Sequence, residues 1–138
     1  MALLDAVKKM LGASPAQTSG STPAPAPQPE PEPFIVPEIM AAELMGVGEA
    51  ARPFLLDCRE LYERRGGFIP GSVHIPMREI PYRLAALDPA ADLVVYCAHG
   101  HRSHDVAGWL IERGFRARSL RGGIAAWQMQ GGPITREG

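Results

Sequence analysis

The chain has 138 residues, with 14 lysines and arginines against 15 aspartates and glutamates and a formal net charge of −1. This length accommodates one domain of ordinary size, and the balanced charge gives no electrostatic reason to expect nucleic acid or an acidic membrane as a partner. The two cysteines, Cys58 and Cys97, are too few for a disulfide framework. They favour a reducing compartment, for which the cytoplasm is the default expectation.

The first 33 residues fall into two zones. Residues 1–11 predict a short amphipathic helix, because apolar side chains recur there at helical spacing: Leu3, Leu4, Val7, Met10 and Leu11. Such a helix could pack on its own domain, or residues 2–11 could dock to a protein partner or a membrane surface. Residues 12–33 hold half of the 14 prolines and predict an extended spacer. We expect no secretory signal and no membrane span.

Residues 34–138 have a globular texture in which short apolar strands alternate with helical patterns. We expect strands within 34–40, 54–58, 71–76, 92–97 and 116–120, and helices within 41–51, 59–67, 80–87, 103–115 and 122–132. This alternation predicts an α/β fold in which helices flank both faces of a central parallel sheet of about five strands.

The segment CAHGHRSHD, residues 97–105, follows the most apolar of these strands. In open parallel sheets, ligands bind beyond the carboxyl ends of the strands, so Cys97 occupies a favourable position for chemistry. Inward-turned backbone N–H groups and a helix N-terminus would lower the pKa of its thiol. Gly100 can take the backbone angles of such a loop, and Arg102 offers a fixed charge for an anionic substrate.

The helix after this loop is expected to begin near Arg102 or Ser103. Ser103 is a good N-cap candidate because its hydroxyl can accept from a free backbone N–H group. Asp105 would then lie in the first turn, where a carboxylate suits the positive end of the helix.

A metal site is the alternative interpretation of this segment. His99, His101 and His104 nearly form the H-x-H-x-D-H pattern of a binuclear hydrolase, but Ser103 stands where the aspartate belongs. A mononuclear site that included Cys97 is chemically allowed, although it would consume the thiolate. We therefore expect neither a metal nor another cofactor.

Four motifs in order resemble the rhodanese family, and the resemblance covers residues 34–138. LLDCRE (55–60) is similar to the end of an early strand in that family, and GGFIPGSVHIP (66–76) to its G-H-I-P-G-A-x-[NH]-I-P stretch. CAHGHRS (97–103) is similar to the C-x-x-G-x-R-S loop, and LRGGIAAW (120–127) to the closing L-x-G-G-x-x-A-W. The sequence departs from the pattern at Phe68, where a histidine is common.

The resemblance implies a rhodanese-like three-layer fold and a sulfurtransferase. Cys97 would take sulfur from a sulfane donor such as thiosulfate, hold it as a persulfide and pass it to cyanide, a thiol or a partner protein. Arg102 would supply a fixed charge for the substrate or the bound sulfur, and the N–H groups of residues 98–102 would stabilise the persulfide. The substrate loop would consist of Ala98, His99, Gly100, His101 and Ser103. Asp57 and Arg59 would tie the loop in place, or would form an ion pair that only braces the fold.

Other activities within and beyond this family have to be compared. Phosphatases and arsenate reductases of related fold need five residues between the cysteine and the arginine, whereas Cys97 and Arg102 are separated by four. A shorter loop suits a single sulfur atom. A sulfur carrier or binding module tethered to a partner stays open, although binding modules generally lack the cysteine.

The roles of three further residues stay open. Cys58 stands where the family usually has an aliphatic residue, and in rhodanese-like cell-cycle phosphatases a cysteine there forms a protective disulfide; it could equally be a small buried apolar group. His99 and His101 could recruit the donor or supply a proton, or could be exposed loop rims.

Overall fold

The computed structural model describes residues 35–136. The helix expected in residues 1–11 and the spacer expected in residues 12–33 lie outside this part of the chain.

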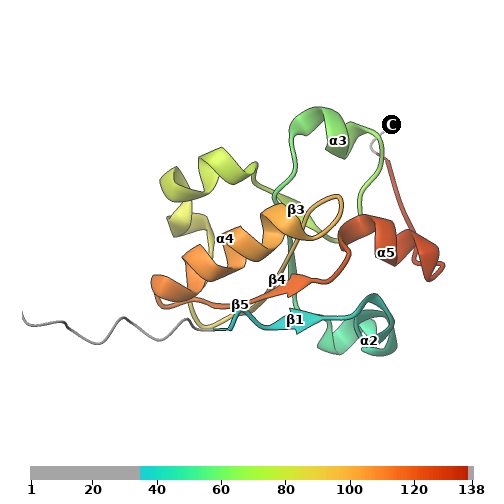
Figure 1. Ribbon diagram of the computed structural model, residues 1–138, viewed down its shortest axis with the longest axis horizontal. Helices are drawn as coiled ribbons and strands as arrows, with labels where there is room; N and C mark the ends of the chain where they lie inside the picture. The colour runs from blue at the N-terminus through green and yellow to red at the C-terminus, as the bar shows by residue number, and fades with distance from the viewer. Residues whose placement is uncertain (1–34, 137–138) are drawn as a thin grey trace, which may run out of the picture. The chain divides into compact units, whose positions relative to one another are not determined.

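The described residues form one parallel sheet at the centre of the fold (Figure 1). Every strand pair is parallel, and the spatial order is β1-β5-β4-β2-β3. The strands of residues 35–136 are β1 (Glu38–Ile39), β2 (Phe54–Asp57), β3 (Val73–His74), β4 (Asp92–Tyr96) and β5 (Arg116–Leu120). The predicted α/β fold with a parallel sheet of about five strands is confirmed.

Helices cover both faces of this sheet (Figure 1). They are α2 (Ala41–Gly46), α3 (Leu61–Arg65), α4 (His101–Glu112) and α5 (Gly123–Met129), with the short 3₁₀ helices η1 (Glu49–Ala51), η2 (Met77–Tyr82) and η3 (Leu84–Ala86).

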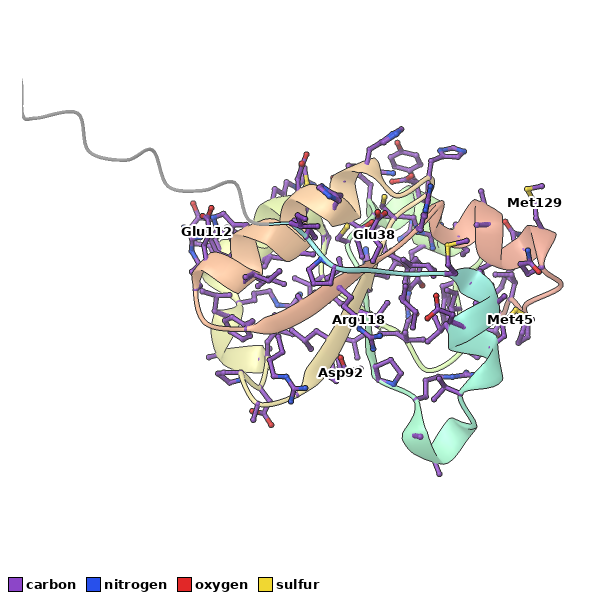
Figure 2. All side chains as sticks on the ribbon, turned by 60° about the horizontal axis from the view of Figure 1, so that its bottom comes forward. Glu38, Met45, Asp92, Glu112, Arg118 and Met129 are labelled. Atoms are coloured by element: carbon purple, nitrogen blue, oxygen red, sulfur yellow. The ribbon has the colours of Figure 1, made fainter. Side chains whose placement is uncertain are left out.

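Two apolar clusters hold these layers together. On one face, Leu56 and Val95 pack with Leu110 of α4. On the other, Val94 packs with Trp127 of α5 and with α2. The three inner strands, β2, β4 and β5, bury side chains on both faces, as expected for the interior of a parallel sheet. Figure 2 shows Met45 of α2 and Met129 of α5 on one side of the molecule, away from Glu112 at the end of α4.

Two of the predicted helices differ from the structure. The helix expected over 41–51 ends at Gly46, and the chain continues through an extended Val47 before η1. Gly46 and Gly48 explain the break, because glycine is a poor helix former. The helix expected over 80–87 is replaced by η2 and η3. Pro81 lies inside η2 and lacks the amide N–H that a continuous α-helix requires.

The sheet topology marks one position on its carboxyl edge. From β2 the chain moves to β3 on one side, whereas from β4 it moves to β5 on the other. The ends of β2 and β4 therefore flank the switch point at which ligands bind in open α/β sheets. Asp57 is paired in register with Tyr96 at these ends.

Among residues 35–136, none of the helices has the length and apolar character that crossing a bilayer requires.

Candidate active site

The Cys97 loop leaves the sheet at the carboxyl end of β4. The strand ends at Tyr96, one residue earlier than predicted, and α4 begins at His101. Cys97 has only 1% of its surface exposed, so its sulfur faces protein groups and not bulk water.

Three hydrogen-bond donors surround the Cys97 sulfur. The Gly100 N–H lies 3.1 Å from Sγ, and the Ser103 N–H lies 3.4 Å from it. The Ser103 hydroxyl is 3.5 Å away, and it donates when Cys97 is a thiolate. The hydroxyl of Ser119 on β5 lies 2.7 Å from that of Ser103, so Ser119 can donate to Ser103 and leave the Ser103 proton for the sulfur.

The start of α4 differs from the prediction in a way that matters for the sulfur. Gly100 is the N-cap, with a left-handed φ of 98°, a conformation that glycine adopts without strain. Ser103 is therefore not the N-cap but lies in the first turn, and the helix has no acidic residue there. Asp105 belongs to the next turn. Because Ser103 is inside the helix, both its N–H and its hydroxyl turn toward Cys97.

The N-terminus of α5 fixes the outer side of the loop. The Ile124 N–H donates to the Cys97 carbonyl at 2.9 Å, and the Ala125 N–H donates to the Ala98 carbonyl at 3.1 Å. A Cβ atom on Gly123 would collide with the Cys97 carbonyl oxygen. Gly123 in LRGGIAAW is thus explained, because a larger residue at this position would push the loop away from α5.

Cys58 lies beside Cys97 on the same face of the sheet. Asp57 and Tyr96 are register partners, and the Tyr96 hydroxyl donates to Asp57 Oδ2 at 3.1 Å. Side chains alternate along a strand, so the next residue of each strand points to the opposite face. Both cysteines are free, are buried, and belong to the cluster beneath α4.

The two thiols have opposite pKa shifts. The pKa of Cys97 is lowered to about 4, chiefly because the Cys58 thiol donates a hydrogen bond to it. Burial opposes this change, while the donors of Ser103 and Gly100 reinforce it. The same hydrogen bond and burial raise the pKa of Cys58. At neutral pH the pair therefore holds one thiolate, on Cys97, and one thiol, on Cys58.

Asp57 and Arg59 form a buried network next to the loop. Asp57 accepts from the Arg59 N–H, Nε and Nη2 groups at 3.0, 2.9 and 2.8 Å, and from Arg64 at 3.3 Å. Arg59 also donates to the Gly67 carbonyl at 2.8 Å. The network thus braces α3 and the turn after it. It reaches the Cys97 loop through Tyr96, and not by the direct bonds that the resemblance implied.

Arg102 is held by a residue from another element. Its two terminal nitrogens donate to the Glu63 carboxylate at 2.8 and 2.7 Å. Glu63 belongs to α3, and its Oε2 also accepts from the Glu60 N–H at 2.9 Å. The bidentate pair raises the pKa of Arg102 and lowers that of Glu63 to about 2.

The histidines occupy different places. His99, His101 and His104 are exposed and line an open hollow beside the loop, together with Arg121, Glu38 and Asp105. His101 is the first residue of α4 and not part of the loop proper. His74 is bonded to the Arg59 carbonyl at 2.7 Å. Within residues 35–136, no three metal-ligating side chains converge as a metal site requires.

A family model described as rhodanese-like domain matches residues 40–130. The chain belongs to this family. The sulfurtransferase of Allochromatium vinosum is 40% identical over 82 residues, which cover 59% of this chain and 77% of that protein. The thiosulfate sulfurtransferase GlpE of Stutzerimonas stutzeri is 36% identical over 75 residues, or 54% and 69% of the two chains.

A solved structure agrees with this assignment. The crystal structure of a rhodanese-related protein from Thermoplasma volcanium matches with a TM-score of 0.68 and 32% identity, over 73% of this chain and 99% of that chain. The rhodanese-like fold expected from the motifs is confirmed, and relatives named sulfurtransferases support a rhodanese-family enzyme.

Two residues of this rhodanese site were missed by the sequence reasoning. Glu63 could have been suspected, because Glu60 and Glu63 have the spacing of a capping box, which the structure contains. Ser119 offered a weaker signal, as a polar residue in a short strand. It became visible only when β5 brought it against Ser103.

Proposed function

We propose that this protein is a sulfurtransferase that carries sulfane sulfur as a persulfide on Cys97. In the first half-reaction the Cys97 thiolate attacks the sulfane sulfur of a donor such as thiosulfate. The S–S bond of the donor breaks, sulfite leaves with the bonding electrons, and Cys97 carries the S–S⁻ group. In the second half-reaction cyanide or an acceptor thiolate attacks the outer sulfur and returns Cys97 as a thiolate.

The observation that carries this proposal is the set of donors around the Cys97 sulfur. Gly100 and Ser103 supply two N–H groups and one hydroxyl within 3.5 Å. Hydrogen bonds to an ionised acceptor are stronger than those between neutral groups, so these donors favour the thiolate that a nucleophile needs. They also supply positive charge close to a persulfide. Ala98, His99 and His101 would line the entrance through which the donor reaches the Cys97 sulfur. Asp57 and Arg59 would support the loop indirectly, through Tyr96.

The loop length supports sulfur transfer over phosphate chemistry. Four residues separate Cys97 from Arg102, one fewer than in the phosphatases of related fold. Arg102 is also engaged by Glu63 in two short hydrogen bonds, so its charge is not free to hold a phosphate dianion.

Cys58 has a second proposed role, as a partner that closes on Cys97 under oxidation. Adjacent strands lie roughly 4.8 Å apart, within the usual range of Cα separations in disulfides. After mild peroxide treatment, a Cys58–Cys97 peptide should be found by mass spectrometry. Sulfinic acid on Cys97 without that crosslink would rule out this protective role for Cys58.

The proposed sulfur transfer is tested by a thiosulfate:cyanide assay of the parent and of Cys97→Ser, with an aryl phosphate as a parallel substrate. We expect the parent to form thiocyanate and the variant to be inactive. After treatment with thiosulfate, intact mass should show one added sulfur atom that cyanide removes. Phosphate hydrolysis without any added sulfur would contradict the proposal, as would a parent that takes sulfur from no sulfane donor.

A further inference from the structure

The Arg102–Glu63 pair changes the electrostatics at the entrance to Cys97. Arg102 is the second residue of α4, next to Ser103, whose N–H lies 3.4 Å from the Cys97 sulfur. Arg102 therefore stands next in sequence to a donor to the sulfur, and the negative charge of the Cys97 thiolate contributes to the raised pKa of Arg102. A free guanidinium at this position would attract anionic reagents.

Glu63 prevents this in two ways. Its carboxylate engages both terminal nitrogens of Arg102 at 2.8 and 2.7 Å, in the fork geometry that suits arginine and carboxylate. The pair is also partly shielded, since the side chains are 17% exposed for Glu63 and 34% exposed for Arg102. The guanidinium therefore contributes little net charge to the entrance.

The carboxylate is held from its own helix as well. Glu63 is the third residue of α3, and its Oε2 accepts from the Glu60 N–H at 2.9 Å while the Glu60 side chain caps the Glu63 N–H. This reciprocal capping box fixes the direction of the Glu63 side chain. Arg102 thus pairs with a carboxylate whose orientation is already fixed by the capping box of α3.

We propose that Glu63 is a positioning and specificity-determining residue, which neutralises Arg102 and so favours hydropersulfide donors, which carry at most one negative charge, over dianionic thiosulfate. The inference rests on the proposed sulfur transfer and names its preferred donor class. With a hydropersulfide R–S–SH, the Cys97 thiolate attacks the outer sulfur, the S–S bond of the donor breaks and R–S⁻ leaves. Cys97 then carries S–SH, and both the charges and the sulfur atoms balance. Thiosulfate stays usable but brings two negative charges to an entrance that offers little net positive charge.

The decisive variant is Glu63→Gln. Glutamine keeps an acceptor for the Glu60 N–H and for Arg102, because a capping box takes either residue, and it removes only the charge. We expect kcat/KM for thiosulfate to rise about tenfold, mainly through a lower KM, since the uncovered charge acts at short range. The kcat/KM for an alkyl hydropersulfide should change by no more than about threefold, because this donor carries at most one negative charge.

Three further variants complete the measurement. Arg102→Gln, which leaves Glu63 uncompensated, should lower kcat/KM for thiosulfate, and the double variant should return toward the parent. Glu79→Gln is the matched control, because Glu79 pairs with Arg83 at 3.9 Å on the surface. It should leave kcat/KM unchanged for both donors. If Glu63→Gln lowers kcat/KM equally for both donors, Glu63 is only a structural brace and the inference is overturned.

A second readout needs no sulfur transfer. Alkylation of Cys97 by anionic iodoacetate, divided by alkylation with neutral iodoacetamide, should rise about fivefold in Glu63→Gln. In the parent the iodoacetate rate should depend only weakly on salt, which tests the neutralised entrance without any substitution. An unchanged ratio together with a normal persulfide would sink this inference and leave the proposed function standing. A raised ratio without any persulfide would do the reverse.

Discussion

The ends of β2 and β4 lie side by side at the same edge of the sheet, and each is followed by a cysteine on the same face. Beyond β4 the backbone turns inward, and the Cys97 sulfur receives N–H and hydroxyl donors. Beyond β2 the chain is held by charged side chains around Asp57, and the Cys58 thiol acts as a donor.

This contrast shows that position at a strand end does not by itself make a cysteine reactive. The neighbouring groups decide which sulfur carries the negative charge. A loop that offers donors stabilises the thiolate on Cys97, whereas Cys58 remains protonated and helps to stabilise its neighbour. The two strand ends therefore differ in role, since one holds the ionised sulfur and the other braces the neighbouring turn with charged side chains.

The largest expected effect is on stability, and it comes from removing the Asp57 charge from its buried network with Arg59 and Arg64. Asp57→Asn would leave Arg59 and Arg64 buried without their charged partner, and should lower the free energy of unfolding by about 3–5 kcal/mol. Burial raises the pKa of Asp57, but hydrogen bonds from both arginines outweigh burial and leave it below its ordinary value. The stability that this carboxylate contributes is therefore present above the ordinary aspartate pKa and is lost as the pH falls.

The matched control for Asp57 lies on the surface. Asp92 pairs with Arg118 at 2.9 Å, and Figure 2 shows the two side chains on neighbouring strands. Asp92→Asn should cost only about 0–1 kcal/mol. Chemical denaturation of the three proteins measures the difference, and equal losses in the two variants would contradict the bracing role of Asp57.

Removing a donor from the other strand end should have a smaller effect on stability and a clear one on reactivity. Ser103→Ala deletes the hydroxyl near the Cys97 sulfur. The pKa of Cys97 should rise, and because this hydroxyl would also donate to the forming persulfide, the rate of persulfide formation should fall roughly tenfold. Ser119→Ala, which removes the group that orients Ser103, should do the same to a lesser degree. Thiolate absorbance against pH reports both changes, and an unshifted Ser103→Ala curve would exclude the hydroxyl as a donor.

The smallest predicted effect separates the two cysteines. Cys58→Ala removes the thiol donor and should raise the pKa of Cys97, whereas Cys58→Ser retains an O–H donor and should change it less. Because the pKa starts near 4, much of Cys97 should stay ionised at neutral pH, and the rate should fall by less than about threefold. A Cys97 thiolate titration in Cys58→Ala that matches the parent would show that the Cys58 donor is unimportant.

Much of this site could be predicted from local sequence. Alternating apolar strands and helices indicated the parallel sheet. The position of Cys97 directly after β4 indicated that backbone N–H groups would donate to its sulfur. The left-handed Gly100 could be anticipated, because a tight loop requires such a residue. Local rules failed for Ser103, since its hydroxyl fitted an N-cap pattern that the glycine before the helix had already taken over.

The remaining features depend on tertiary contacts. Glu63 and Arg102 are 39 residues apart in the chain, and only the packing of α3 against the loop brings them together. The partnership of Cys58 with Cys97 likewise follows from the strand register. Neither contact leaves a periodic pattern, so the motifs could indicate Cys97 as the candidate residue but not the groups that tune its pKa.

The most direct test of this account is the rate of iodoacetamide alkylation of Cys97 as a function of pH. Peptide mass spectrometry assigns the alkylated cysteine, with Cys58 as the internal comparison. The account predicts half of the maximal Cys97 rate near pH 4 and a constant rate through neutral pH, because the thiolate is already formed. A rate that keeps rising through neutral pH toward about 8.5, as for an unperturbed thiol, would contradict it.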